Sequence, residues 1–210
     1  MDGRRESPWR RRSRDVAYEN QWITVWHDDV TRPDGGPGIY GVVHFASVAV
    51  GVVPIDDNDE VTLVGQYRYP LDAWSWEIPE GGVPFEEDPL DGARRELREE
   101  TGIEAAEWQE IGRFHLSNSI SDEAAVAYLA TGLTRGESSP DETEALEVRR
   151  VTFDEALAMT LDGRITDALS VLALQRVGLA RLAAANATGG ATIAGTSPRA
   201  ASGGGSASDG

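Results

Sequence analysis

Glu96, Glu99 and Glu100 are the residues whose type and spacing could do chemistry. In an α-helix, positions i, i+3 and i+4 share one face, so these carboxylates would crowd together and repel one another. A solvated acidic helix face is one interpretation. The other is that a divalent cation offsets the repulsion. Oxygen ligands alone suit a hard ion such as Mg²⁺ or Mn²⁺, which takes its remaining ligands from water and a substrate phosphate.

The sequence predicts the helix that would hold these glutamates. Asp88 can cap the N-terminus, and Pro89 fits the first helical position, where its missing N–H does no harm. Gly102 fits the position just after the last turn, where a left-handed backbone is common. We therefore expect one helix between Asp88 and Gly102.

The segment from Gly81 to Ile103 resembles the signature of the Nudix hydrolases, G-x5-E-x7-R-E-U-x-E-E-x-G-U, in which U is aliphatic. The chain matches every fixed and aliphatic position, at Gly81, Glu87, Arg95, Glu96, Leu97, Glu99, Glu100, Gly102 and Ile103. A chance match of this kind is roughly one in a million or rarer per chain at average residue usage. The resemblance favours the metal-site interpretation of the helix.

The resemblance implies which residues would bind the metal. Glu96 and Glu100 would be ligands, and Glu99 would be a further ligand or a hydrogen-bond acceptor beside them. The backbone carbonyl of Glu80 is an additional expected ligand. Mg²⁺ is the expected cofactor, with Mn²⁺ as an alternative.

Other matched residues would support this site. Arg95 would orient the carboxylates through its fork of donors, and Glu87 would hold Arg95. Gly81 would allow a tight turn before the helix, and Gly102 would end the helix.

The implied reaction is hydrolysis of a diphosphate. Cations neutralise the charge that repels a nucleophile and acidify water, while a carboxylate base completes the activation. The resemblance places this base in the loop LSNSISDE, where Glu123 fits best and Asp122 lies beside it. Glu144 is a second candidate.

Residues around the signature are similar to the ADP-ribose and nucleoside-diphosphate-sugar pyrophosphatase branch of the family. The similar segments are Gln66-Tyr67-Arg68 and the run from Trp76 to Gly81. This resemblance covers about residues 16–180, and it implies a homodimer whose N-terminal sheets help to build both sites. Arg68, Glu77 and Trp22 are the expected substrate-binding residues; for Trp22, stacking on a nucleobase competes with simple packing.

One feature departs from the ADP-ribose-specific members, which carry a proline about fifteen residues beyond the signature. No proline occurs between Ile103 and Ser139. The departure leaves other nucleoside-diphosphate sugars open as substrates. Two further alternatives are a hydrolase of dinucleotides or NADH, and a regulator that binds ADP-ribose without cleaving it. Such a regulator should have lost signature carboxylates, which are all present here.

Apolar alternation predicts strands at residues 21–27, 39–45, 46–53 and 60–67, mixed with a few helices. The expected fold is α/β, a Nudix-type α/β/α sandwich with a mixed sheet and a small N-terminal β-hairpin or sheet region. The expected organisation is a disordered basic arm (1–14), a β region used in dimerisation (15–46), the catalytic domain (47–186) and a disordered Gly/Ala/Ser tail (187–210).

Composition limits the possible partners. The formal net charge is -17, which disfavours nucleic acid and anionic membranes as partners. The longest apolar stretch, near residues 45–55, is too short to span a membrane. The chain has no cysteine, which removes disulfides and thiolate chemistry and is compatible with a reducing cytoplasm. We therefore expect a small nucleotide sugar as the partner.

Overall fold

The structure is a computed structural model that describes residues 6–136 and 146–190. The chain divides into two compact units, residues 1–177 and 178–210. The first unit contains the described sheets, two helices and the start of a third helix, and the described part of the second unit continues that helix.

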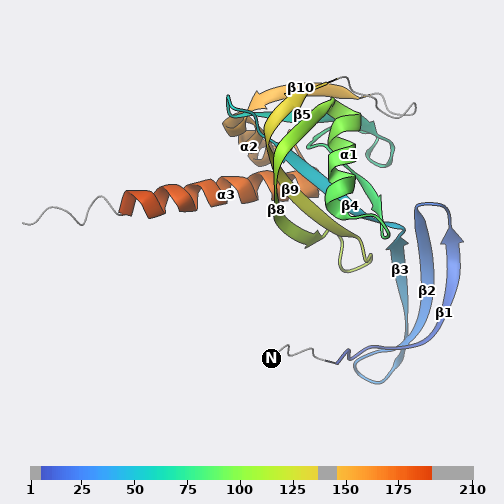
Figure 1. Cartoon of the computed structure of the whole chain (residues 1–210). Coiled ribbons are helices and arrows are strands. Elements are labelled where there is room, and N and C mark those ends of the chain that lie inside the picture. Colours follow the sequence, from blue (N-terminus) through green and yellow to red (C-terminus); the bar gives the residue numbers. More distant parts are fainter. Residues whose placement is uncertain (1–5, 137–145, 191–210) are drawn as a thin grey trace, which may run out of the picture. The chain divides into compact units, whose positions relative to one another are not determined.

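In the described residues the strands form three sheets (Figure 1). An N-terminal antiparallel sheet has the order β1-β2-β3, with β1 at Arg10–Glu19, β2 at Ile23–Thr31 and β3 at Pro37–Phe45. A mixed sheet has the order β7-β4-β9-β8, with β4 at Ser47–Pro54, β7 at Glu80–Pro84, β8 at Ile103–His115 and β9 at Ala124–Arg135. A third sheet has the order β10-β5-β6, with β5 at Glu60–Arg68, β6 at Ala73–Glu77 and β10 at Glu147–Thr152. The helices are α1 at Pro89–Thr101, α2 at Phe153–Asp162 and α3 at Ala168–Gly190, with a short 3₁₀ turn at Tyr69–Leu71.

Both faces of the mixed sheet are buried. On β9, Val126 and Tyr128 pack with Leu97 of α1, while Ala125 and Ala127 face the opposite core with α2 and α3. This alternation follows from the two-residue period of a strand. β4 and β9 pair in parallel and their other neighbours in the sheet are antiparallel. The predicted layered α/β sandwich with a mixed sheet is confirmed.

The N-terminal sheet begins earlier than the sequence predicts. Strand β1 includes residues 10–14, which were expected to belong to a disordered arm. The physical reason is charge complementarity, because Arg14 forms a 2.7 Å ion pair with Asp28 of β2. The Arg14 guanidinium also lies 3.7 Å from the ring centroid of Trp26. Acidic and aromatic partners on β2 therefore order part of the basic segment.

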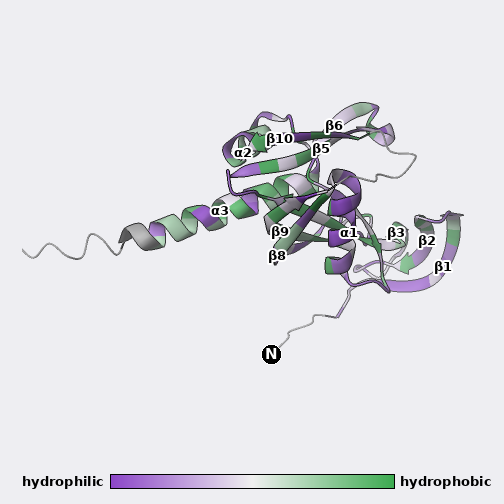
Figure 2. Cartoon of the chain, turned by 45° about the horizontal axis from the view of Figure 1, so that its top comes forward, coloured by the Kyte–Doolittle hydropathy of each residue, from purple (hydrophilic) through white to green (hydrophobic). Residues whose placement is uncertain are grey.

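Helix α1 forms as the sequence predicts. The Asp88 side chain accepts a hydrogen bond from the Leu90 N–H at 2.9 Å, and Pro89 occupies the first position. Gly102 adopts a left-handed φ of 68° and donates to the Arg98 carbonyl. Leu97 is fully buried in the core, and hydrophilic residues of α1 are visible in purple in Figure 2.

Helix α3 ends later than the expected domain boundary at residue 186. It begins at Ala168, where Asp167 caps it by accepting from the Ser170 N–H at 2.7 Å. It continues to Gly190, into the segment expected to be a disordered tail, because the alanine-rich residues 183–187 favour helix. The rest of that segment lies outside the described residues.

Over residues 168–187, α3 is also long and apolar enough to cross a membrane, by length and composition alone. Leu169 and Leu174 of this helix are buried in the protein core. Packing within the protein therefore accounts for the apolar character of the first half of the helix.

Gly92 allows α1 to lie close to β7, and its replacement tests this contact. A Cβ at Gly92 would lie 2.2 Å from Cγ2 of the fully buried Val83. We expect Gly92→Ala to lower the free energy of unfolding by about 1–3 kcal/mol, because the core must shift to admit the methyl group. Chemical denaturation measures the effect. Gly41→Ala is the control, since a Cβ there meets nothing within 4 Å; equal stabilities would contradict the close packing.

Candidate active site

The candidate site lies where β6, β7 and α1 meet. Glu77 ends β6, Glu80 begins β7, and α1 carries the glutamates of the signature. The Glu80 N–H donates to Oε2 of Glu100 at 3.1 Å, which ties the start of β7 to the helix. Glu100 is 4% exposed. Carboxylates from distant parts of the sequence are thus brought together in one partly buried place.

Arg95 organises the outer part of the site. Its Nη1 donates to Oε1 of Glu96 at 2.8 Å and to Oε2 of Glu99 at 3.2 Å, and its Nη2 donates to Oε2 of Glu87 at 3.5 Å. These are the contacts that the predicted roles of Arg95 and Glu87 require. One guanidinium therefore offsets the repulsion among several carboxylates of the signature.

Gly81 is needed for a reason that the sequence did not reveal. It lies in β7 opposite Val50, within a regular ladder, and not in the tight turn that was expected. A Cβ at this position would lie 2.2 Å from Cδ of Glu96 and 2.4 and 2.5 Å from its two carboxylate oxygens. Gly81 therefore leaves room for the Glu96 carboxylate against the strand.

Arg68 joins two further glutamates. Its Nε donates to Oε1 of Glu77 at 2.9 Å, and its Nη2 donates to Oε1 of Glu80 at 2.8 Å. Glu77 is only 2% exposed, so its place in the structure is that of a buried partner of Arg68. About a third of the Arg68 side chain remains exposed. Of these two predicted substrate-binding residues, Arg68 is the one that reaches solvent.

The Glu80 side chain is unusual. Its Oε2 atom is buried and has no hydrogen-bond partner among the described residues. Burial raises the pKa of Glu80 well above its ordinary value, the charges of Asp167 and Glu77 raise it further, and Arg68 opposes them. A buried oxygen without a partner, surrounded by negative charge, is costly unless a cation or proton joins it.

The residues present fit a hard divalent cation. Glu80, Glu96 and Glu100 offer oxygen ligands only, which is the donor set that Mg²⁺ and Mn²⁺ prefer. Across residues 6–136 and 146–190, no three acidic or histidine side chains converge closely enough to hold an ion as they stand. Arginines engage two of the candidate carboxylates instead, Arg95 at Glu96 and Arg68 at Glu80.

Asp167 is a site residue that sequence reasoning missed. Besides capping α3, its charge acts on Glu80, Arg68 and Glu123. An acidic residue three positions before Ser170 and ahead of an apolar run was a recognisable helix cap. No sequence pattern could show that this cap points toward residues almost ninety positions earlier.

Glu123 and Asp122 have different surroundings. Burial raises the pKa of Glu123, and the charge of Asp167 raises it further. Asp122 is directed elsewhere, because its Oδ2 lies 2.6 Å from Nδ1 of His44. The structure therefore brings Glu123, and not Asp122, into the electrostatic environment of the site. Glu144 lies outside the described residues.

Trp22 is not brought to the carboxylates within one chain. Its side chain is 64% exposed in the turn between β1 and β2. Its N–H donates to Oδ1 of Asn20, and its carbonyl accepts from the Ala46 N–H. The predicted stacking of Trp22 on a nucleobase therefore requires a site other than the one in its own chain, such as the site of a second copy of the chain.

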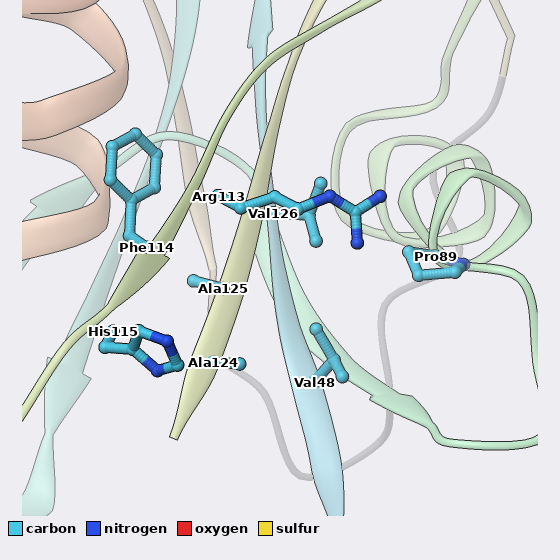
Figure 3. A pocket seen from close by; sticks show the side chains of 8 residues that line it. All are labelled: Val48, Pro89, Arg113, Phe114, His115, Ala124, Ala125 and Val126. Carbon is cyan, nitrogen blue, oxygen red and sulfur yellow. The ribbon is translucent and has the colours of Figure 1, made fainter. Parts of the chain in front are cut away.

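A small pocket lies between the ends of β8 and β9 and the neighbouring Val48 and Pro89 (Figure 3). It has a volume of about 230 Å³, and Val48, Pro89, Arg113 and Val126 are among the residues that line it. None of the predicted site residues lines this pocket. The candidate site is therefore defined by its charged groups and not by the pocket.

Comparison with protein families gives two matches. The NUDIX domain matches residues 46–171, and the nucleoside diphosphate sugar hydrolase N-terminal domain matches residues 9–43. The second match covers most of the N-terminal sheet. Together they span the residues from which the candidate site is built.

Named relatives match over most of their length. A methanol dehydrogenase activator of Bacillus methanolicus is 36% identical over 160 residues, covering 75% of this chain and 86% of the relative. An ADP-ribose pyrophosphatase of Bacillus subtilis (strain 168) is 32% identical over 165 residues, covering 78% of this chain and 89% of the relative. A solved structure described as an ADP compounds hydrolase has a TM-score of 0.73 at 22% identity, covering 80% of this chain and 91% of the other. This last likeness supports the fold.

Gly81→Ala tests whether Glu96 must lie against β7 for cation uptake. The added Cβ would overlap the Glu96 carboxylate. We expect Mn²⁺ affinity, measured by electron paramagnetic resonance titration, to fall roughly 10- to 100-fold, as when a ligand loses its support. Gly82→Ala is the matched control, since its Cβ would meet only the Ser47 side chain, with the rotatable Oγ at 2.9 Å and Cβ at 3.6 Å. Equal Mn²⁺ affinities in the two variants would show that the position of Glu96 does not matter.

Proposed function

The chain belongs to the Nudix hydrolase family, and from this premise we propose that it uses Mg²⁺ to hydrolyse the diphosphate of ADP-ribose or a related nucleoside-diphosphate sugar. The products are a nucleoside monophosphate and a sugar phosphate, and one water is consumed. The chain is an enzyme of the ADP-ribose pyrophosphatase type. Beyond this type, we propose that the metal is Mg²⁺ and that the substrate is a nucleotide sugar.

One observation supports this proposal above the others. The Nudix signature runs from β7 through a turn and α1 to the first residue of β8, and Arg95 contacts its carboxylates Glu96, Glu99 and Glu87. A structural acidic helix has no need for a guanidinium that links three carboxylates beside a buried, unpartnered Glu80 oxygen.

In the proposed mechanism, the chain holds and orients the reacting groups. Glu96, Glu100 and the backbone carbonyl of Glu80 would hold the cation, with Glu99 as a further ligand or a hydrogen-bond acceptor beside them. The cation, when bound, would neutralise the diphosphate charge and acidify water. Arg95 keeps the carboxylates oriented. Glu123 accepts the proton of the attacking water, a role open to a carboxylate with a raised pKa.

Substrate contacts and assembly are further parts of the proposal. The exposed part of Arg68 contacts substrate phosphates, because its planar guanidinium suits their oxygens. Large apolar side chains are exposed on the N-terminal sheet, among them Val16, Tyr18, Trp22 and Ile39. These support a homodimer through residues 15–46, in which Trp22 stacks on a nucleobase of the partner's substrate. We place the enzyme in the cytoplasm.

A dinucleotide or NADH is the second candidate substrate class. The absence of proline between Ile103 and Ser139 separates the chain from ADP-ribose-specific members and leaves other nucleoside-diphosphate sugars open as substrates. A regulator that binds without cleaving is disfavoured, because Glu96, Glu99 and Glu100 are all present.

A substrate panel tests the proposal. We expect ADP-ribose or another nucleoside-diphosphate sugar to be cleaved faster than NADH and diadenosine polyphosphates in Mg²⁺. Mass spectrometry of both products identifies the bond that breaks. Preferential cleavage of NADH would replace the first candidate with the second, and no cleavage of any compound would reject the enzymatic proposal.

Glu100→Gln tests the role of the buried carboxylate. The amide oxygen can still accept the Glu80 N–H, so the fold should be retained while the charge is lost. We expect kcat to fall about 100-fold or more, since removing a ligand costs at least as much as removing its support. Steady-state kinetics, with circular dichroism to check the fold, measure this effect. A kcat near that of the unaltered protein would exclude Glu100 from the metal site.

The pH dependence tests Glu123 as the base. A base must be deprotonated, so the rate falls as pH falls through its pKa. Burial and the charge of Asp167 raise the pKa of Glu123. The rate should therefore begin to fall at a pH above that at which an ordinary glutamate titrates. Asp167→Asn removes a negative charge that acts on Glu123 and keeps a side chain that can cap α3. The pKa of Glu123 should therefore fall, and the acid limb of the pH–rate profile should move to lower pH.

The profile of kcat/KM against pH measures this shift. Asp162→Asn is the matched control, because Asp162 forms its ion pair with the exposed Arg164. An acid limb that moves equally in both variants, or in neither, would contradict the assignment of Glu123.

A further inference from the structure

The loop that carries Glu123 is bound to the N-terminal sheet. We call residues 116–123 the base loop. The Val43 N–H of β3 donates to the Ile120 carbonyl at 2.9 Å, and the Asp122 N–H donates back to the Val43 carbonyl at 3.2 Å. The base loop thus pairs with the edge of β3 through its backbone, immediately before Glu123.

Side chains reinforce this contact. Nδ1 of His44 lies 2.6 Å from Oδ2 of Asp122, and the Phe45 N–H donates to Oδ1 of the same carboxylate at 3.2 Å. Because a carboxylate only accepts, the His44 Nδ1–H is the donor. The His44 ring stacks on Trp26 at a centroid distance of 4.6 Å and lies 6.3 Å from Phe85. The stacking on Trp26 and the hydrogen bond to Asp122 therefore restrict the orientation of the imidazole.

Asp122 and Glu123 are adjacent, so fixing the first restricts the second. Both carboxylate oxygens of Asp122 contact residues of β3, while the negative charge of Asp167 acts on Glu123. Neighbouring Cα atoms are only about 3.8 Å apart, so a shift of Asp122 carries Glu123 with it.

We propose that His44 and Asp122 form a positioning pair, through which the N-terminal sheet fixes the base loop and so aims Glu123 at the attacking water. This rests on the proposed function, in which Glu123 is the base. It gives the N-terminal sheet a role within its own chain, separate from dimerisation. Asp122 acts through its neighbour and not as a base itself.

His44→Ala should lower kcat about 10- to 100-fold with little change in KM. A base displaced by about 1 Å loses rate on that scale, and a contact made only in the transition state affects kcat and not ground-state binding. His27→Ala is the matched control. His27 lies in the same sheet and its ring is 3.9 Å from Asp29, a residue outside the base loop. We expect its kinetics to match those of the unaltered protein.

Two further variants separate positioning from simple loss of structure. His44→Asn places an amide N–H near the position of Nδ1 and should recover much of the lost kcat. Asp122→Ala should have the same defect as His44→Ala, and the double variant should be no worse than either single variant, because both changes remove one interaction. The proposed positioning pair would be overturned if the kcat losses of the two single variants multiplied in the double variant. It would also be overturned if His44→Asn recovered none of the lost kcat.

Hydrogen–deuterium exchange gives a readout that does not depend on activity. We expect faster exchange of the Val43 and Asp122 amides in His44→Ala, and unchanged exchange in His27→Ala. Unchanged exchange at these amides in His44→Ala would overturn the inference.

The two proposals can fail separately. If the unaltered protein cleaves no substrate of the panel, the proposed function fails, and exchange still tests the contact. If the unaltered protein is active and His44→Ala has the kcat of His27→Ala, the positioning role fails and the proposed function stands.

Discussion

Mutual repulsion of carboxylates is the constraint on which the site depends. Glu77 and Glu100 are buried and Glu80 is partly buried, with its Oε2 atom fully covered, where unbalanced negative charge is expensive. Arg68 and Arg95 supply the balancing charge within the chain, each reaching more than one glutamate. The balance is incomplete at Glu80, whose Oε2 has no partner among the described residues. In the proposed function a cation would complete this balance, and the contacts of Arg68 and Arg95 hold the carboxylates in place.

Local chemistry made α1 and its contacts predictable from sequence. Asp88, Pro89 and Gly102 act through backbone hydrogen bonds and dihedral angles that depend on a few neighbouring residues. The i, i+3, i+4 spacing fixed the common face of the glutamates, and the same geometry puts Arg95 within reach of Glu99. The layered α/β fold followed from alternating apolar strands, although the positions of strand ends did not.

Contacts between distant residues were not predictable. The Gly81 position is explained by a Glu96 side chain that reaches across from another element, and the expected turn does not exist there. Residues 10–14 became part of a strand because Asp28 and Trp26 on its neighbour receive Arg14, and composition alone suggested only a basic arm. Asp167 could be recognised as a cap but not as a neighbour of Glu80. In each case, tertiary packing decided what a local pattern left open.

The start of α3 has a consequence for how the enzyme is made. The Ser170 Oγ accepts from the Ile78 N–H at 2.9 Å, a contact between residues 92 positions apart, and both groups are buried. Contacts so distant in sequence form late, because a long loop must close before they are made. During synthesis, Ser170 emerges from the ribosome long after Ile78. Until then, the nascent chain lacks the hydrogen bond that anchors the segment leading to Glu80. The signature helix precedes α3 in the chain, so its residues are synthesised before the hydrogen bond that anchors the segment leading to Glu80 can form.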